Sequence, residues 1–142
     1  MECRKYLLIS IKPQYAKEII AAKKTVELRK SRPKIKNGDI LVIYESSPVM
    51  KVTGICEVEK IIEMPINSLW EIVNGQASVS REEFFKYYEK KINGIGIFLK
   101  NPRNLAKKIK LKEISNDIIA PQSYRYITEE MYKKVLCLGF EL

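Results

Sequence analysis

The chain of 142 residues contains no histidine, and this absence removes several classes of catalytic site. Histidine is the usual base beside a serine or cysteine nucleophile, so Ser-His-Asp and Cys-His systems are excluded. Zinc sites built on imidazole ligands are excluded as well. Any catalysis would therefore use lysine, carboxylate, tyrosine or hydroxyl side chains.

Cysteine is scarce too. Cys3, Cys56 and Cys137 are widely spaced and form no Cys-x-x-Cys pair, which argues against a zinc finger and against a disulfide framework. Cys56 and Cys137 lie within apolar runs and are predicted to be buried thiols. No P-loop is present, and no Gly-x-Gly-x-x-Gly follows a predicted strand. We expect no metal and no cofactor.

Long apolar runs are also missing. No segment approaches the roughly 18 apolar residues that a membrane-spanning helix needs. The first residues do not have the long apolar region and small-residue cleavage site of a signal peptide. We therefore expect a cytoplasmic protein with no membrane partner, folded as one domain over residues 1–142.

Acidic residues are outnumbered by basic ones. The chain has 26 lysines and arginines against 17 acidic residues, for a formal net charge of +9. A domain with this excess is a candidate for binding RNA or another polyanion. The alternative is a solvated lysine surface without a specific partner. Lysine greatly outnumbers arginine, so each arginine carries more weight as a specific phosphate or base contact.

The apolar pattern predicts strands and helices in the order β-α-β-β-β-α-α-β-β-α. The predicted strands are Tyr6–Ile11 and residues 25–30, 40–44, 51–58, 92–100 and 107–114. One helix is predicted over residues 13–22, two begin with the capping-box patterns Ser68 to Glu71 and Ser80 to Glu83, and the last begins near Thr128. Many short strands and glycine-marked bends favour an α+β fold with a small mixed β-barrel and flanking helices. Gly94 and Gly96 indicate a bend or a close backbone approach rather than a nucleotide-binding loop.

Three ionisable side chains gather where the first helix gives way to a strand. Lys24, Glu27 and Arg29 lie within six residues. In an extended segment, Glu27 and Arg29 share one face, opposite Val26 and Leu28. Such a concentration of charge is more typical of a small polar cleft than of an ordinary surface strand.

This segment resembles the signature of the ASCH domain, a branch of the PUA-like superfamily. The signature is Gly-x-Lys-x-x-Glu-x-Arg, and Lys24, Glu27 and Arg29 match it, while Ala22 replaces the glycine. The Gly38-Asp39 turn, the strand at 40–44 and the run Ser46-Ser47-Pro48 also fit the pattern. The resemblance implies a PUA-like β-barrel, a cleft lined by the signature, and an RNA-related role.

We therefore predict that the cleft binds RNA or a nucleotide-like small molecule. Lys24 would contact a phosphate or base carbonyl, or act as a base if burial lowered its pKa. Glu27 and Arg29 would either recognise the ligand or form a structural ion pair. Tyr44 would stack on a base or lie at the edge of the core. The predicted site consists of Ser10, Lys12, Lys24, Glu27, Arg29, Tyr44, Ser46 and Ser47.

A second basic feature lies later in the chain. Lys108, Lys110 and Lys112 alternate with Ile109 and Leu111 in the predicted strand 107–114. The three lysines would form a ladder on one face. It would either track a phosphate backbone or protect an edge strand from aggregation.

Two other function classes stay open. One branch of the family that this chain resembles deacylates N4-acetylcytidine and related nucleosides with the signature lysine, a threonine and a separate glutamate. Here Glu27 stands at the threonine position and residues 74–80 contain no acid, so only Lys24 matches as a catalytic residue. Other members are linked to ribonuclease activity. The third class is a regulatory or interaction module, and the oligomeric state is open.

Overall fold

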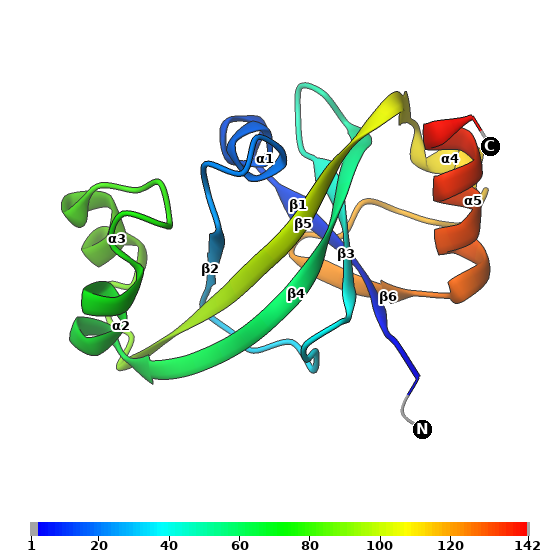
Figure 1. Ribbon diagram of the computed structural model, residues 1–142. Helices are drawn as coiled ribbons and strands as arrows, with labels where there is room; N and C mark the ends of the chain where they lie inside the picture. The colour runs from blue at the N-terminus through cyan, green and yellow to red at the C-terminus, as the bar shows by residue number, and fades with distance from the viewer. Residues whose placement is uncertain (1–2, 142) are drawn as a thin grey trace.

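The computed structural model describes residues 3–141 (Figure 1). Its elements, in chain order, are β1 (Tyr6–Ile11), α1 (Pro13–Ile20), β2 (Val26–Arg29), β3 (Ile40–Glu45), β4 (Lys51–Pro65), α2 (Ile66–Val73), α3 (Arg81–Tyr87), β5 (Asn93–Ile109), α4 (Leu111–Ile114), β6 (Tyr124–Ile127) and α5 (Glu129–Phe140).

The strands form one open sheet in the order β2-β5-β4-β3-β1-β6. The β1–β3 pair is parallel and the other pairs are antiparallel. The expected α+β class is confirmed, but the predicted closed β-barrel is wrong. The edge strands β2 and β6 are only four residues long. β2 pairs with β5, and β6 pairs with β1. A barrel requires hydrogen bonds between its two edges, and the described strands form none there.

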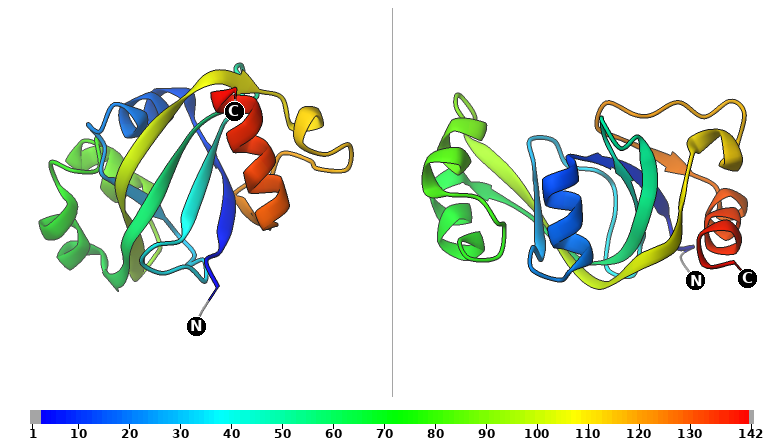
Figure 2. Two further views of the ribbon diagram at one scale, coloured as in Figure 1. Left: turned by 45° about the vertical axis from the view of Figure 1, so that its right-hand side comes forward. Right: turned by 90° about the horizontal axis from the view of Figure 1, so that it is seen from above.

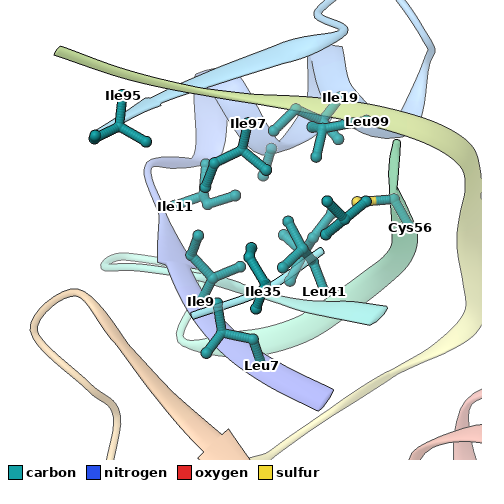
Figure 3. Packing of buried hydrophobic residues seen from close by; sticks show 13 residues of the cluster. Leu7, Ile9, Ile11, Ile19, Ile35, Leu41, Cys56, Ile95, Ile97 and Leu99 are labelled. Carbon is teal, nitrogen blue, oxygen red and sulfur yellow. The ribbon is translucent and has the colours of Figure 1, made fainter. Parts of the chain in front are cut away.

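The sheet is nevertheless strongly bent, mainly by its two longest strands. β4 and β5 contain 15 and 17 residues, and their pairing shifts register at three points. Such bulges bend a strand pair and increase its twist. Figure 3 shows the result, in which side chains from β1, β3, β4 and β5 point toward one another and toward Ile19 of α1. The first apolar core therefore lies inside the bent sheet.

Two further apolar clusters attach helices to this sheet. Val135 of α5 is buried with Leu8, Val42 and Ile109 on the outer face of the sheet. Leu69 of α2 and Phe84 of α3 are buried with β2 and the β4–β5 pair. Figure 2 shows α2 and α3 at one end of the molecule and α4 and α5 at the other. β2 thus lies between the first core and the α2–α3 pair.

Most predicted elements are confirmed, several with longer bounds. β1 has the predicted residues, α1 covers most of 13–22, and β2 and β3 lie at 25–30 and 40–44 within one residue at each end. The strands predicted at 51–58 and 92–100 are the first parts of β4 and β5. Ser80 and Glu83 form a reciprocal capping box, and Thr128 caps α5 by accepting from the Met131 N–H.

Three local predictions are wrong. Ser68 does not cap a helix, because α2 already begins at Ile66 after Pro65. The predicted strand 107–114 breaks at its centre: β5 ends at Ile109 and α4 follows. Cys137 is exposed, whereas Cys56 is buried as predicted, and its burial raises the pKa of the Cys56 thiol to about 12. The sequence pattern also missed β6, which has only four residues.

Gly94 meets the expectation of a close backbone approach. A Cβ atom at this position would lie 2.8 Å from the ring of Tyr88. That ring is buried, and its hydroxyl hydrogen bonds to the carbonyl oxygens of Arg29 (3.0 Å) and Ile95 (3.1 Å), so it has no room to retreat. A Cβ atom at Gly96 would have ordinary contacts, the shortest 3.4 Å, to Leu69.

We expect Gly94→Ala to lower the free energy of unfolding by about 1–3 kcal/mol, the usual cost of overpacking a core. Gly96→Ala, two residues away on the same strand, is the matched control and should change it by much less. Urea denaturation of both variants beside the wild type measures the difference. Equal effects at the two glycines would contradict the assigned packing of Tyr88.

Candidate functional site

The charged junction begins with a tight turn after α1. Ala22 has a φ of 62°, in the left-handed region where the signature has glycine. The N–H groups of Lys23 and Lys24 then both donate to the carbonyl of Glu18, at 2.8 and 3.0 Å. The turn survives the replacement of glycine by alanine, and it directs Lys24 back under the end of the helix.

Lys24 is a buried cation. The residue is 3% exposed, and its ammonium donates a hydrogen bond to the carbonyl of Ala77. Nζ lies 3.7 Å from Glu27 Oε1 and 5.1 Å from the centroid of the Tyr15 ring. Burial lowers the pKa of Lys24, because desolvation of the ammonium outweighs the attraction of the Glu27 carboxylate.

Arg29 is held by four hydrogen bonds. Its Nε and Nη2 donate to Glu27 Oε2 at 3.0 and 2.8 Å. Nη2 also donates to the carbonyl of Ser10 at 2.8 Å, and Nη1 donates to Ser123 Oγ at 3.1 Å. A guanidinium has five N–H groups, so at most one is left for a ligand. The ion pair between Glu27 and Arg29 accounts for two of these four hydrogen bonds, and Ser10 and Ser123 accept the other two.

These contacts join parts of the chain that backbone pairing leaves apart. Arg29 ends β2 at one edge of the sheet, whereas Ser10 belongs to β1 and Ser123 directly precedes β6 at the other edge. One arginine side chain thus bridges the open side of the bent sheet.

A pocket of about 360 Å³ opens beside this bridge. Its volume lies within the range of small-molecule sites. β1, α1, β2 and α3 contribute to its wall, together with segments before β4 and β6. The lining residues are Ser10, Ile11, Lys12, Tyr15, Lys24, Glu27, Leu28, Arg29, Ser46, Val79, Glu83, Phe84, Tyr87 and Gln122.

Six of the eight residues predicted for the site line this pocket. They are Ser10, Lys12, Lys24, Glu27, Arg29 and Ser46. Tyr44 does not: it is 4% exposed and continues the row of Ile40 and Val42 on the face that packs against α5. Ser47 is exposed in the turn after β3 and is not among the lining residues.

The lysine ladder does not form as predicted. Lys108 lies near the end of β5, Lys110 precedes α4, and Lys112 lies within α4. Because a strand and a helix have different periods, the three side chains do not share one strand face. All three are exposed.

The sequence pattern missed several pocket residues. Tyr15 and Tyr87 contribute aromatic rings, and the Tyr87 hydroxyl donates to the carbonyl of Leu28 at 3.3 Å. Tyr87 could have been suspected, because it lies beside the core row Phe84, Phe85 and Tyr88 without belonging to it. Gln122 lies more than 90 residues from β2 in the chain, and no local pattern marks it.

No helix among residues 3–141 has the length and apolar character to cross a membrane. Within the same residues, no group of three or more cysteine, aspartate and glutamate side chains is placed to hold a metal ion. The polar and aromatic groups that line the pocket are two lysines, the Glu27–Arg29 pair, the Glu83 carboxylate, serine hydroxyls, Gln122 and aromatic rings.

The chain is similar to several known proteins. The ASCH domain model matches residues 9–115. An ASCH domain-containing ribonuclease from Zymomonas mobilis is 31% identical over 140 residues, which cover 95% of this chain and 93% of that protein. A crystal structure of ASCH from Zymomonas mobilis has a TM-score of 0.90 at 30% identity, with 96% of each chain covered. The N-terminal domain of Staphylothermus marinus McrB shares the fold alone, with a TM-score of 0.65 at 12% identity over 97% of this chain and 96% of that one.

The buried ammonium leads to a pH prediction. Because the pKa of Lys24 is lower in the folded protein than its usual 10.5, the unfolded chain binds more protons between these two values. The free energy of unfolding of the wild type should therefore rise, relative to Lys24→Met, as the pH increases toward 10.5. The gain is about 1.4 kcal/mol for each unit of pKa difference.

Urea denaturation at a series of pH values measures this difference. Every other titratable group is present in both proteins, so the comparison isolates the change at residue 24. Lys17→Met, which removes an exposed lysine from α1, is the control and should show no such trend. If the difference in the free energy of unfolding between the wild type and Lys24→Met did not change with pH, this would contradict the burial of the charged group.

Proposed function

The chain belongs to the ASCH domain family, and on this premise we propose that it binds RNA through an unpaired nucleotide held in the pocket of Lys24, Glu27 and Arg29. A single observation carries the proposal. The three signature side chains, which the sequence only places near one another, converge on one pocket that also contains aromatic rings.

Each part of a nucleotide has a matching group in the pocket. The ammonium of Lys24 has three N–H groups, of which one binds Ala77 and one faces Glu27, so one is left for a base carbonyl or phosphate. Arg29 occupies Glu27 Oε2, which leaves Oε1 as the better acceptor for an exocyclic amine. Lys12 adds a third cation to the wall, besides Lys24 and Arg29.

The aromatic rings suit a base. Tyr15 and Tyr87 both line the pocket, and Tyr87 is 39% exposed. Stacking of a base on an aromatic side chain contributes about 1–3 kcal/mol and tolerates any base. An unpaired nucleotide exposes both its base face and its hydrogen-bonding edge, so single-stranded or looped RNA fits this pocket better than a duplex does.

Lys24→Met should weaken the binding of a short single-stranded RNA about tenfold or more, because it removes a charge-assisted hydrogen bond of roughly 1.5–3 kcal/mol. Fluorescence anisotropy with labelled RNA at several salt concentrations measures the effect. Lys17→Met removes the same charge from the exposed face of α1 and should change the affinity less than about twofold. Equal losses in both variants would show that only the net charge matters and would remove the pocket from the proposal.

Cleavage of the bound RNA is the second candidate function. The name of the 31% identical relative from Zymomonas mobilis favours it. In this pocket the Glu27 carboxylate would accept the proton of a ribose 2′-hydroxyl, whose oxygen attacks the adjacent phosphate and expels the 5′-oxygen of the next nucleotide. Lys24 would stabilise the charge that develops on the phosphate. The 5′-oxygen would take up a proton from water as it leaves, and Glu27 would then return its proton to solvent, so the products are a 2′,3′-cyclic phosphate and a 5′-hydroxyl.

Incubating equimolar protein with end-labelled RNA tests cleavage. If the pocket cleaves RNA, Glu27→Gln and Lys24→Met should each reduce the rate at least about 100-fold, and a single 2′-deoxy substitution should protect the bond. Lys17→Met should cleave like the wild type. Cleavage that persists in Lys24→Met would come from a contaminant or another site, and no cleavage by the wild type would leave binding alone.

A further inference from the structure

The connection between β2 and β3 carries positive charge at its exposed positions. Residues 30–36 read Lys-Ser-Arg-Pro-Lys-Ile-Lys, with four basic side chains and no acidic one. The four basic residues are exposed, whereas Pro33 and Ile35 are buried. Exposed and buried residues alternate along this segment, and Ile35 packs in the core inside the bent sheet. Arg32 and Lys34 are therefore held toward solvent.

This segment starts at the rim of the pocket. Arg29, the last residue of β2, lines the pocket, and the next residue, Lys30, places Nζ 4.7 Å from the centroid of the Tyr87 ring. Tyr87 itself lines the pocket. Lys34 lies five positions after Arg29, so their Cα atoms are at most about 18 Å apart. The basic segment therefore begins at the rim of the pocket and stays within that distance of Arg29.

The segment ends in a basic hollow on the surface. A hollow of about 800 Å³ is lined by Arg32 and Lys34 together with Arg4 and Lys5, which precede β1. A neighbouring hollow of about 500 Å³ shares Arg4, Lys5 and Lys34 and adds Tyr126 of β6. In Figure 1 the connection runs along the lower edge of the molecule, below β4, toward β3 and the start of the chain.

Contacts from two other segments hold Lys34 in place. The Lys5 ammonium donates to the carbonyl of Lys34 at 3.0 Å, and the N–H of Lys34 donates to the Tyr126 hydroxyl at 2.9 Å. Lys5 Nζ also lies 6.0 Å from the centroid of the Tyr126 ring. The fold thus holds the Lys5 ammonium against the backbone of Lys34, whose side chain is exposed.

Few acidic groups oppose these cations. The Glu63 carboxylate lies 3.8 Å from Arg32, and both side chains are about half exposed, so this pair is weak. Glu129 lines the smaller hollow. Asp39 is buried and accepts the backbone N–H groups of Lys5 and Lys36, so its charge is used within the protein.

We propose that Lys30, Arg32, Lys34 and Lys5 form a track for the phosphate backbone of single-stranded RNA that leaves the pocket along residues 30–36. The direction of the RNA rests on the proposed function of the pocket. Lysine ammoniums act as point charges, which neutralise phosphates without reading bases. The track therefore adds affinity for longer RNA and little sequence preference.

The double variant Arg32→Gln/Lys34→Gln tests the track with two labelled RNAs, a dinucleotide and a strand of about 12 nucleotides. Binding of the longer strand should weaken about fivefold or more at low salt. The slope of log affinity against log salt should become shallower by about 1.4, because each phosphate contact contributes about 0.7 for single strands. The dinucleotide, which reaches only the pocket, should bind as it does to the wild type.

Lys108→Gln/Lys112→Gln is the matched control, with the same loss of charge at exposed positions away from the track. Lys5→Gln, on the other wall of the hollow, should repeat the length-dependent loss. Equal behaviour of the Arg32/Lys34 variant and the control would overturn the track. If polyglutamate at equal charge concentration displaced the long strand, the track would bind polyanions in general, and RNA would be overturned as the occupant of the track.

The two proposals fail in distinguishable ways. If the long strand loses affinity in Arg32→Gln/Lys34→Gln but the wild type does not bind the dinucleotide, the track stands and the pocket proposal fails. If the dinucleotide binds in a Lys24-dependent manner and the long strand gains nothing from its length, the pocket proposal stands and the track is overturned.

Discussion

The hydrogen bonds between Glu27 and Arg29 are the interaction on which the site depends. The carboxylate lies between two cations, Lys24 at 3.7 Å and Arg29 at 2.8 Å, and Glu27 is only 7% exposed. Removing Glu27 would leave two cations with little exposure and no counter-charge, which is far more costly than losing a surface ion pair. With Glu27 in place, Arg29 can also reach Ser10 and Ser123. The same contact therefore orders the pocket and keeps its charges in balance.

The open sheet explains why the pocket lies where it does. A closed barrel would join its edge strands by backbone hydrogen bonds and would leave no gap between them. Here β2 and β6 do not pair, and the Arg29 side chain spans the gap in place of a ladder. Polar groups that hold the edges together therefore also face a ligand-sized space. Lys24, Glu27 and Arg29 line a pocket here, whereas the expected barrel does not form.

Local patterns could predict most of the helices and strands and part of the candidate site. The alternation of Val26 and Leu28 against Glu27 and Arg29 is a property of any strand, and it placed the charged face correctly. Tyr44 could not be placed, because β3 is buried on both faces and its sequence shows no alternation. The break between β5 and α4 also escaped prediction, because the lysine and isoleucine alternation there fits a strand.

By itself the sequence determined which chemistry is available: no imidazole, a surplus of lysine, and one segment where Lys24, Glu27 and Arg29 lie close together. Only the tertiary structure decided how those groups are used. It buried Lys24, gave Arg29 two further partners that lie 19 and 94 residues away, and brought Lys34 beside Lys5. The physical reason is that local periodicity reports neighbours within one turn or strand. Desolvation and long-range hydrogen bonds depend on which strands pair and how far the sheet bends.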